Sequence, residues 1–251
     1  MLEGLKGNRK VVMLTAYDCQ TARLLEQAGV DLILVGDSLG MVVLGYESTK
    51  QVTMQEMLHH TRAVAKGAKN TPIIGDMPIG SYATPELALE NARKFIEAGA
   101  MGVKVEGCVK EVIHELISNK IPVMGHLGLL PQTAEKYKLV GKLDNEAEKI
   151  FEDAQAIDKF GVFSMVLECV PEQLAKKITE NVKSITIGIG AGKYCDGQVL
   201  VINDLLGMDE RFKPKYVKKY ADMSEIIKKA AMEFKKEVES GEFPDDAHSF
   251  H

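Results

Sequence analysis

The chain has 251 residues, 45% of them hydrophobic, and its 31 basic and 36 acidic residues give a formal net charge of −5. This length is enough to bury the core of one α/β domain. Because charges of both signs are mixed along the chain, nothing favours binding to nucleic acid or to an anionic membrane. The N-terminal residues lack the apolar stretch of a signal peptide, and no apolar run approaches the ~20 residues of a membrane span. We therefore expect a cytoplasmic protein that acts on small molecules.

Eight short apolar runs predict β-strands. In chain order they cover residues 11–17, 31–37, 71–77, 102–107, 122–128, 163–169, 184–190 and 198–204. Strands that are apolar almost throughout, separated by helical stretches, are typical of a (β/α)8 barrel, whereas a doubly wound open sheet more often uses fewer strands. We predict an α/β fold of the TIM-barrel type, formed by a single domain over residues 1–251.

The helical stretches between the strands have recognisable starts. Thr53 and Glu56 have the spacing of a capping box at the start of residues 53–67. Thr84 followed by Pro85 is typical of a helix N-cap and first turn.

Three further segments are predicted outside these units. The connections after the second and fifth strands, residues 39–52 and 129–145, are long enough to act as lids. A C-terminal amphipathic helix is expected at about residues 222–240, followed by a frayed tail.

Four acidic residues stand at the carboxyl ends of predicted strands: Asp37, Asp76, Glu106 and Glu168. The carboxyl ends of barrel strands share one mouth, where catalytic residues are usually found. Buried carboxylates repel one another unless a cation or a proton compensates them. Oxygen donors without paired histidines favour a hard cation such as Mg²⁺ over zinc. The sequence thus predicts a metal-assisted acid/base site.

Strand periodicity adds Lys104 and His126 to this site. Lys104 and Glu106 are two residues apart, so both side chains point to the same face of their strand. His126 is the only histidine on a predicted strand end, where it either contacts substrate or serves as a core histidine. Any single acid could instead cap the following helix, as we expect of Asp18.

The four cysteines, Cys19, Cys108, Cys169 and Cys195, are far apart and form no CxxC pair. Neither a zinc site nor a disulfide framework is indicated, so we expect free thiols.

Six sequence blocks resemble the ketopantoate hydroxymethyltransferase family. They are VGDSLGMVVLGY (35–46), GDMPIGSY (75–82), VKVEG (103–107), GHLGLLPQ (125–132), VLECVP (166–171) and GIGAGKYCDGQVLVINDLLG (188–207). The similarity runs in order from about residue 10 to residue 220. Two positions depart from the usual pattern, Leu130 in place of a threonine and Asn203 in place of a histidine. These departures bear on folate or lid contacts and leave the reaction unchanged.

The resemblance implies a barrel related to the phosphoenolpyruvate and pyruvate enzymes, dependence on Mg²⁺ and assembly as a homodecamer. It also implies the reaction, which belongs to pantothenate biosynthesis. A hydroxymethyl group would pass from 5,10-methylenetetrahydrofolate to 3-methyl-2-oxobutanoate through a Mg-stabilised enolate, giving 2-dehydropantoate.

The resemblance further assigns roles to residues. Asp37 and Asp76 would hold the metal and meet the substrate, with Glu106 near the metal or bound through water. Ser38 and Lys104 would bind the substrate carboxylate. Glu168 would be the catalytic base.

Rival functions remain at this point. The glycine-rich segment 188–192 follows the seventh strand, where many barrels bind phosphate, so a phosphosugar aldolase or isomerase is an alternative. Lys104 could instead be a Schiff-base lysine, although the acid cluster would then have no role. A catalytically silent barrel that serves as a scaffold is the third possibility, and the presence of every assigned polar residue argues against it.

Overall fold

The computed structural model describes residues 4–209 and 214–251. The chain divides into two compact units, Met1–Val201 and Ile202–His251. The expectation of a single domain stays a prediction. In the described parts of the chain, no helix combines the length and the apolar character that a membrane span needs.

Eight parallel strands are described in the first unit, and they close into a barrel in the order β1-β2-β3-β4-β5-β6-β7-β8. Their bounds are β1 Val11–Thr15, β2 Leu32–Val35, β3 Ile73–Asp76, β4 Gly102–Glu106, β5 Val123–Gly128, β6 Ser164–Glu168, β7 Ile185–Ile189 and β8 Gly197–Leu200. Pairing of Val11 in β1 with Gly197 in β8 closes the circle. The predicted (β/α)8 barrel is confirmed.

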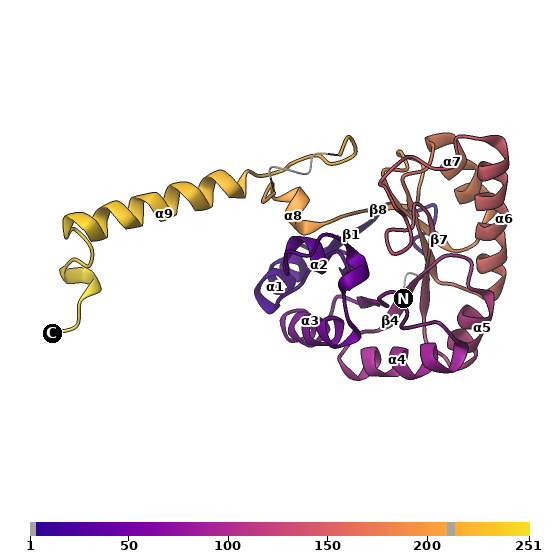
Figure 1. Ribbon diagram of the computed structural model, residues 1–251, viewed down its shortest axis with the longest axis horizontal. Helices are drawn as coiled ribbons and strands as arrows, with labels where there is room; N and C mark the ends of the chain where they lie inside the picture. Colours follow the sequence, from indigo (N-terminus) through magenta and orange to yellow (C-terminus); the bar gives the residue numbers. More distant parts are fainter. Residues whose placement is uncertain (1–3, 210–213) are drawn as a thin grey trace. The chain divides into compact units, whose positions relative to one another are not determined.

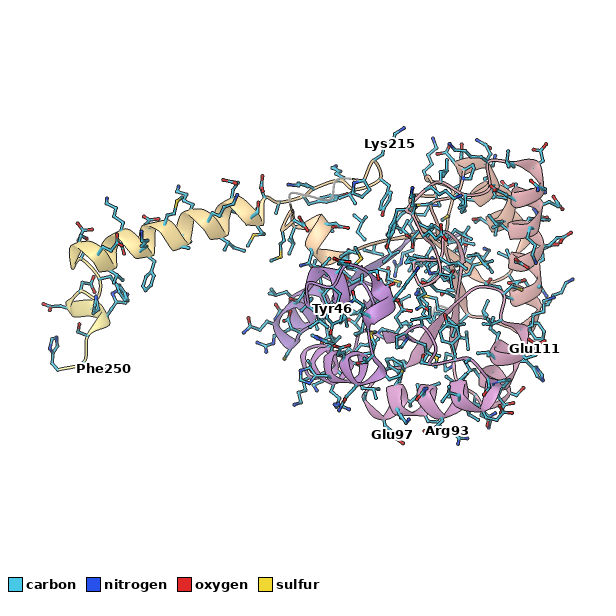
Figure 2. All side chains as sticks on the ribbon, in the orientation of Figure 1. Tyr46, Arg93, Glu97, Glu111, Lys215 and Phe250 are labelled. Carbon is cyan, nitrogen blue, oxygen red and sulfur yellow. The ribbon has the colours of Figure 1, made fainter. Side chains whose placement is uncertain are left out.

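Helices cover the outside of the strands (Figure 1). Those of the first unit are α1 Cys19–Gln27, α2 Leu39–Val42, the 3-10 turn η1 Thr49–Gln51, α3 Met54–Gly67, α4 Pro85–Glu97, α5 Lys110–Ser118, α6 Asp144–Phe160 and α7 Glu172–Asn181. On α4, Arg93 and Glu97 project from the outer side of the helix, away from the barrel (Figure 2).

The predicted helix starts are confirmed. Thr53 and Glu56 form a complete capping box at the start of α3, and the hydroxyl of Thr84 accepts a hydrogen bond from the Leu87 amide in α4. Asp18 caps α1 by accepting hydrogen bonds from the amides of Gln20 and Thr21. Asp18 is therefore structural, as expected.

The eighth strand is shorter than predicted. Strand β8 ends at Leu200, and the last residues of the predicted run fold as a short helix, α8 (Ile202–Leu205). A short apolar run does not distinguish a strand from one turn of helix by its periodicity, so the sequence placed this boundary wrongly.

The second unit contains α8, the long helix α9 (Met223–Ser240) and the 3-10 turn η2 (Asp246–His248). Helix α9 confirms the predicted C-terminal helix and ends at Gly241, whose φ of +77° lies in the left-handed region that favours glycine. In the expected frayed tail, Asp245 caps η2 and the ring of Phe243 packs against Phe234 of α9.

The barrel interior is packed with apolar side chains and is not a pore. It contains Val11, Met13, Leu32, Leu34, Ile74, Met124, Val166, Ile185, Ile187 and Val199. In place of an apolar side chain, β4 contributes Lys104, which is buried. A plug of hydrocarbon therefore lies beneath the polar groups at the carboxyl ends of the strands.

Candidate active site

The four predicted acids lie together at the carboxyl ends of the strands. Asp76, Glu106 and Glu168 are the last residues of β3, β4 and β6, and Asp37 comes two residues after the end of β2. All four side chains are buried, with residue exposures of 2% to 7%. Their placement at one mouth agrees with the sequence analysis.

Strand register brings basic groups opposite these acids. In the parallel pairs, Asp76 is level with Lys104 and Glu106 is level with His126. The Nζ atom of Lys104 lies 2.5 Å from Oδ1 of Asp76 and 3.9 Å from Oε1 of Glu106. Burial alone would lower the pKa of Lys104, but the Asp76, Glu106 and Asp37 carboxylates raise it above its ordinary value. Lys104 is therefore a fixed positive charge.

His126 lies between two carboxylates. Its Nδ1 is 3.4 Å from Oε1 of Glu106, and its Nε2 is 3.2 Å from Oε2 of Glu168. Neither nitrogen makes a hydrogen bond of good geometry. Burial and Lys104 act to lower the pKa of His126, but the two carboxylates raise it to about 9. For Glu106, burial acts to raise the pKa of the carboxyl, but His126 and Lys104 hold that pKa below its ordinary value.

Asp37 and Asp76 form the least compensated pair. The backbone amide of Asp37 donates to Oδ2 of Asp76 over 3.3 Å, which places the two residues side by side. Burial raises the pKa of Asp37 well above its usual range, and the Asp76 carboxylate raises it further. Burial also raises the pKa of Asp76, although Lys104 opposes this. The shifts mean that protein groups alone do not neutralise this part of the mouth.

These residues fit a hard divalent cation. The two adjacent aspartates offer oxygen donors with excess negative charge, and Oε1 of Glu106 is buried without a hydrogen-bond donor. Among residues 4–209 and 214–251, no three His, Cys, Asp or Glu side chains converge into a complete metal-binding group. A Mg²⁺ ion usually keeps water or substrate oxygens, so an incomplete protein ligand set does not conflict with it.

Gln132 is a central residue that the sequence analysis did not single out. It is 1% exposed, and its Nε2 donates to Oδ2 of Asp37 and to the carbonyl of Met77, both over 2.9 Å. Its backbone amide donates to Oε2 of Glu106 over 3.2 Å, and its own Oε1 accepts from the Tyr82 hydroxyl over 2.5 Å. The available signal was its position at the end of the GHLGLLPQ block.

The loop after β5 also reaches the base candidate. The amide of Leu129 donates to the carbonyl of Glu168, and the amide of Val140 donates to the carbonyl of Cys169. Cys169 has a φ of +48°, a costly backbone conformation for a residue with a side chain. Burial raises the pKa of Tyr137, which lies in the same loop, and the Glu168 carboxylate raises it further. Sequence reasoning missed Tyr137 because loop residues follow no strand periodicity.

Ser38 lies next to Asp37 at the start of α2, and its hydroxyl is 2.8 Å from that of Tyr17. In the described part of Met1–Val201, no other histidine forms an ion pair or a hydrogen bond with the four acids. His60 uses Nδ1 to contact the carbonyl of Tyr17, while His59 and His114 are exposed. All four cysteines are free thiols, as predicted.

Replacing Gln132 tests its structural role. A Gln132→Met substitution keeps the side-chain length but removes the hydrogen bonds to Asp37, Met77 and Tyr82. We expect the free energy of unfolding to fall by ~2–4 kcal/mol, since a buried polar group without a partner costs about 1–3 kcal/mol. Chemical denaturation measures the change. Tyr82→Phe, which removes one of these bonds, should cost less, and equal stability of Gln132→Met and the unsubstituted protein would contradict the role.

Comparison with known proteins connects this arrangement to a family. The family model described as ketopantoate hydroxymethyltransferase matches residues 1–246. The 3-methyl-2-oxobutanoate hydroxymethyltransferase of Syntrophus aciditrophicus is 53% identical over 252 residues, which cover 98% of this chain and 93% of the relative.

Solved structures at low identity share the fold. A 2,3-dimethylmalate lyase, described as a member of the PEP mutase/isocitrate lyase superfamily, matches with a TM-score of 0.62 and 13% identity, covering 99% of this chain and 89% of the other. A phosphonopyruvate hydrolase solved with oxalate and Mg²⁺ matches with a TM-score of 0.64 and 14% identity, covering 98% and 89%. These matches show that the barrel fold is shared with both enzymes.

Proposed function

Because the chain belongs to the ketopantoate hydroxymethyltransferase family, we propose that it transfers a hydroxymethyl group from 5,10-methylenetetrahydrofolate to 3-methyl-2-oxobutanoate. The product is 2-dehydropantoate, an intermediate of pantothenate biosynthesis. The observation that carries the proposal is the meeting of Asp37, Asp76, Lys104 and Glu168 at one buried barrel mouth. This set can bind an anionic oxo acid and remove a proton from it.

Glu168 is the proposed base. It would take the proton from C3 of the oxo acid, and the electrons of the broken C–H bond would form the enolate. That carbon would then bond to the methylene carbon of the folate, and water would supply the hydroxyl group as tetrahydrofolate leaves. The Nε2 atom of His126 lies 3.2 Å from Oε2 of Glu168, so His126 is proposed to position this carboxylate by charge and to contact the substrate.

Asp37 and Asp76 are the proposed ligands of a Mg²⁺ ion, with Glu106 beside it or bound through water. When bound, the ion would polarise the keto and carboxylate oxygens of the substrate, which makes the C3 proton more acidic. Burial and neighbouring carboxylates raise the pKa of both aspartates, and a bound cation would relieve the cost of ionising them, which supports this assignment.

Lys104 and Ser38 are the proposed partners of the substrate carboxylate. One donor of the Lys104 ammonium group is used by Asp76, which leaves two for the substrate. The same carboxylates that hold Lys104 protonated disfavour a Schiff base, because a nucleophilic amine must be neutral.

The rival functions are less well supported. The relative that is 53% identical is named for the hydroxymethyl transfer and not for phosphosugar chemistry. A turnover assay with 3-methyl-2-oxobutanoate and with phosphosugars distinguishes hydroxymethyl transfer from phosphosugar chemistry. Absence of both activities would favour the catalytically silent scaffold.

A homo-oligomer in the cytoplasm is the proposed state of the protein, and a homodecamer is the form that the family resemblance implies. Free thiols fit a reducing compartment. No described residue of α9 is buried. Three of its apolar residues, Ile226, Phe234 and Val238, are 47% to 55% exposed and recur on one side of the helix. Such an apolar stripe favours contact with another copy of the chain.

Substitution of the base tests the chemical step. Glu168→Gln keeps the shape of the side chain but cannot accept the proton, so C3 exchange should slow by about a hundredfold to ten-thousandfold. NMR in D₂O without folate follows this exchange separately from one-carbon transfer. Binding of 3-methyl-2-oxobutanoate should persist, which serves as the control. Exchange at the unsubstituted rate would exclude Glu168 as the base.

Calorimetric titration tests the cation. With 3-methyl-2-oxobutanoate present, Asp37→Asn should weaken Mg²⁺ binding at least about tenfold, because it removes a charged oxygen donor from the proposed site. Glu106→Gln should weaken it less if Glu106 acts through water. Asp18→Asn, which affects only the cap of α1, is the control. Unchanged Mg²⁺ affinity in Asp37→Asn would refute the assignment, and EDTA should abolish turnover of the unsubstituted protein.

Light scattering tests the assembly. Ile226→Glu places a charge in the apolar stripe of α9 and should lower the mass of the particle in solution, because burying an unpaired charge is costly. Lys236→Glu, on the opposite side of the helix by its spacing, should leave the mass unchanged. A monomeric unsubstituted protein would contradict the proposal, as would an unaltered mass for Ile226→Glu.

A further inference from the structure

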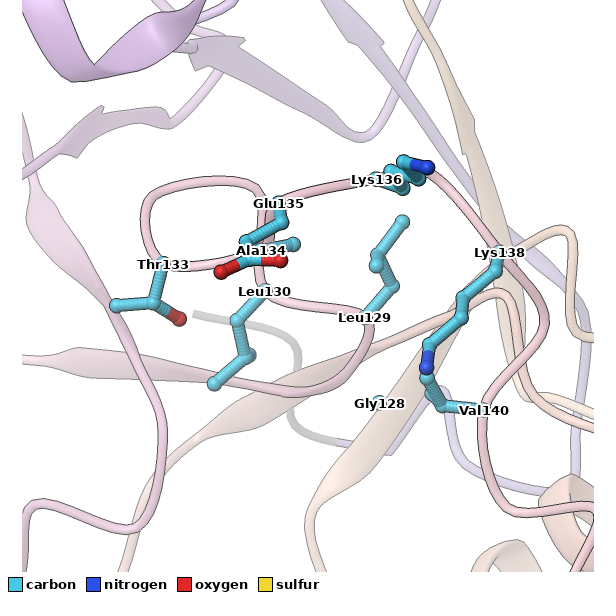
Figure 3. A pocket seen from close by; sticks show the side chains of 9 residues that line it. All are labelled: Gly128, Leu129, Leu130, Thr133, Ala134, Glu135, Lys136, Lys138 and Val140. Carbon is cyan, nitrogen blue, oxygen red and sulfur yellow. The ribbon is translucent and has the colours of Figure 1, made fainter.

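A pocket of about 440 Å³ lies within the loop that follows β5. Nine residues between Gly128 and Val140 line it, and Figure 3 shows their side chains. The volume falls in the range of small-molecule sites. None of the site residues assigned so far lines this pocket, so its role is open.

The lining combines an apolar wall with two cations. Leu129, Leu130 and Val140 provide the apolar part, while Lys136 and Lys138 are exposed. Within the described parts of the chain, neither lysine forms an ion pair or a hydrogen bond. A ligand with a flat apolar body and a negatively charged end would complement both features.

The pocket adjoins the proposed base. Gly128 is level with Glu168 in the β5–β6 pair, and the amide of Leu129 donates to the Glu168 carbonyl over 2.9 Å. At the other end of the loop, the amide of Val140 donates to the carbonyl of Cys169 over 2.9 Å. The segment that lines the pocket is thus hydrogen-bonded near both of its ends to the backbone of the proposed base and of the residue after it.

We propose that this pocket binds the aminobenzoylglutamate half of the folate cosubstrate, with Lys136 and Lys138 facing the glutamyl carboxylates. The inference rests on the proposed function and adds the position and orientation of the cosubstrate. The aminobenzoyl ring would contact Leu129, Leu130 and Val140. The reactive methylene carbon would then point toward Glu168.

Charge supports this orientation. The barrel mouth already holds four buried carboxylates and would also hold the carboxylate of the first substrate beside Lys104, so it does not favour the two further carboxylates of a glutamyl tail. The loop pocket has two lysines against one acid, Glu135. The anionic tail is therefore favoured at the lysines, away from the acids, and Glu135 should weaken its binding.

Binding of two ligands to matched variants tests the contact. The ligands are tetrahydrofolate and tetrahydropteroate, which lacks the glutamyl group, titrated into the complex with 3-methyl-2-oxobutanoate and Mg²⁺. Lys136→Ala/Lys138→Ala should raise the Kd for tetrahydrofolate by roughly three- to thirtyfold, as expected for two exposed ion pairs, and change that for tetrahydropteroate much less. The difference should shrink at high salt.

Two controls complete the experiment. Lys142→Ala removes a lysine of the same loop that does not line the pocket, and it should leave both Kd values unchanged. Glu135→Gln should lower the Kd for tetrahydrofolate. The C3 exchange of 3-methyl-2-oxobutanoate without folate should keep its rate in every variant.

The outcomes distinguish this inference from the proposed function. Three results would each overturn the pocket assignment. The Lys136→Ala/Lys138→Ala variant could raise the Kd of both ligands equally or leave the Kd for tetrahydrofolate unchanged, or Lys142→Ala could have as large an effect as the double variant. If the unsubstituted protein forms 2-dehydropantoate, the proposed function stands whatever the lysine variants do. If it neither exchanges C3 nor forms product, the proposed function itself fails.

Discussion

Buried negative charge at the barrel mouth is the constraint on which the rest of the site depends. Four carboxylates are removed from water beside Lys104 and His126, and burial makes every uncompensated charge expensive. The local responses differ: Lys104 and His126 stay protonated, Glu106 stays ionised, and Asp37 is pushed toward protonation. A bound cation would remove that last penalty, so the electrostatics favour the same partner that the proposed chemistry uses.

The closed barrel supplies the geometry for this balance. Parallel register fixes Asp76 beside Lys104 and Glu106 beside His126, and the hydrocarbon plug below keeps water out. Because backbone pairing places each acid level with its basic partner, the side chains of a pair begin next to one another. Pre-organised charges of this kind are what stabilise a developing enolate without reorganisation during the reaction.

The sequence predicted the strand-borne part of this site because strand residues obey a period of two. Lys104 and Glu106 could be placed on one face, and strand ends identified Asp76 and Glu168. The prediction failed where periodicity ends. Gln132 and Tyr137 lie in a loop, and their positions depend on contacts between segments far apart in the chain. The β8 boundary was wrong because one helical turn resembles a short strand in sequence.

The loop after β5 is hydrogen-bonded both to the proposed cation ligands and to the backbone beside Glu168. At Gln132 it holds Asp37 and Glu106, on the side of the proposed cation, and at Val140 it is tied to the strained residue that follows Glu168. The segment between these anchors, residues 133–139, contains the lysines of the loop pocket. A ligand in that pocket would therefore contact a segment whose ends are hydrogen-bonded to the proposed cation ligands and to the backbone beside the proposed base. The loop and the proposed catalytic groups are thus connected through hydrogen bonds already present in the protein.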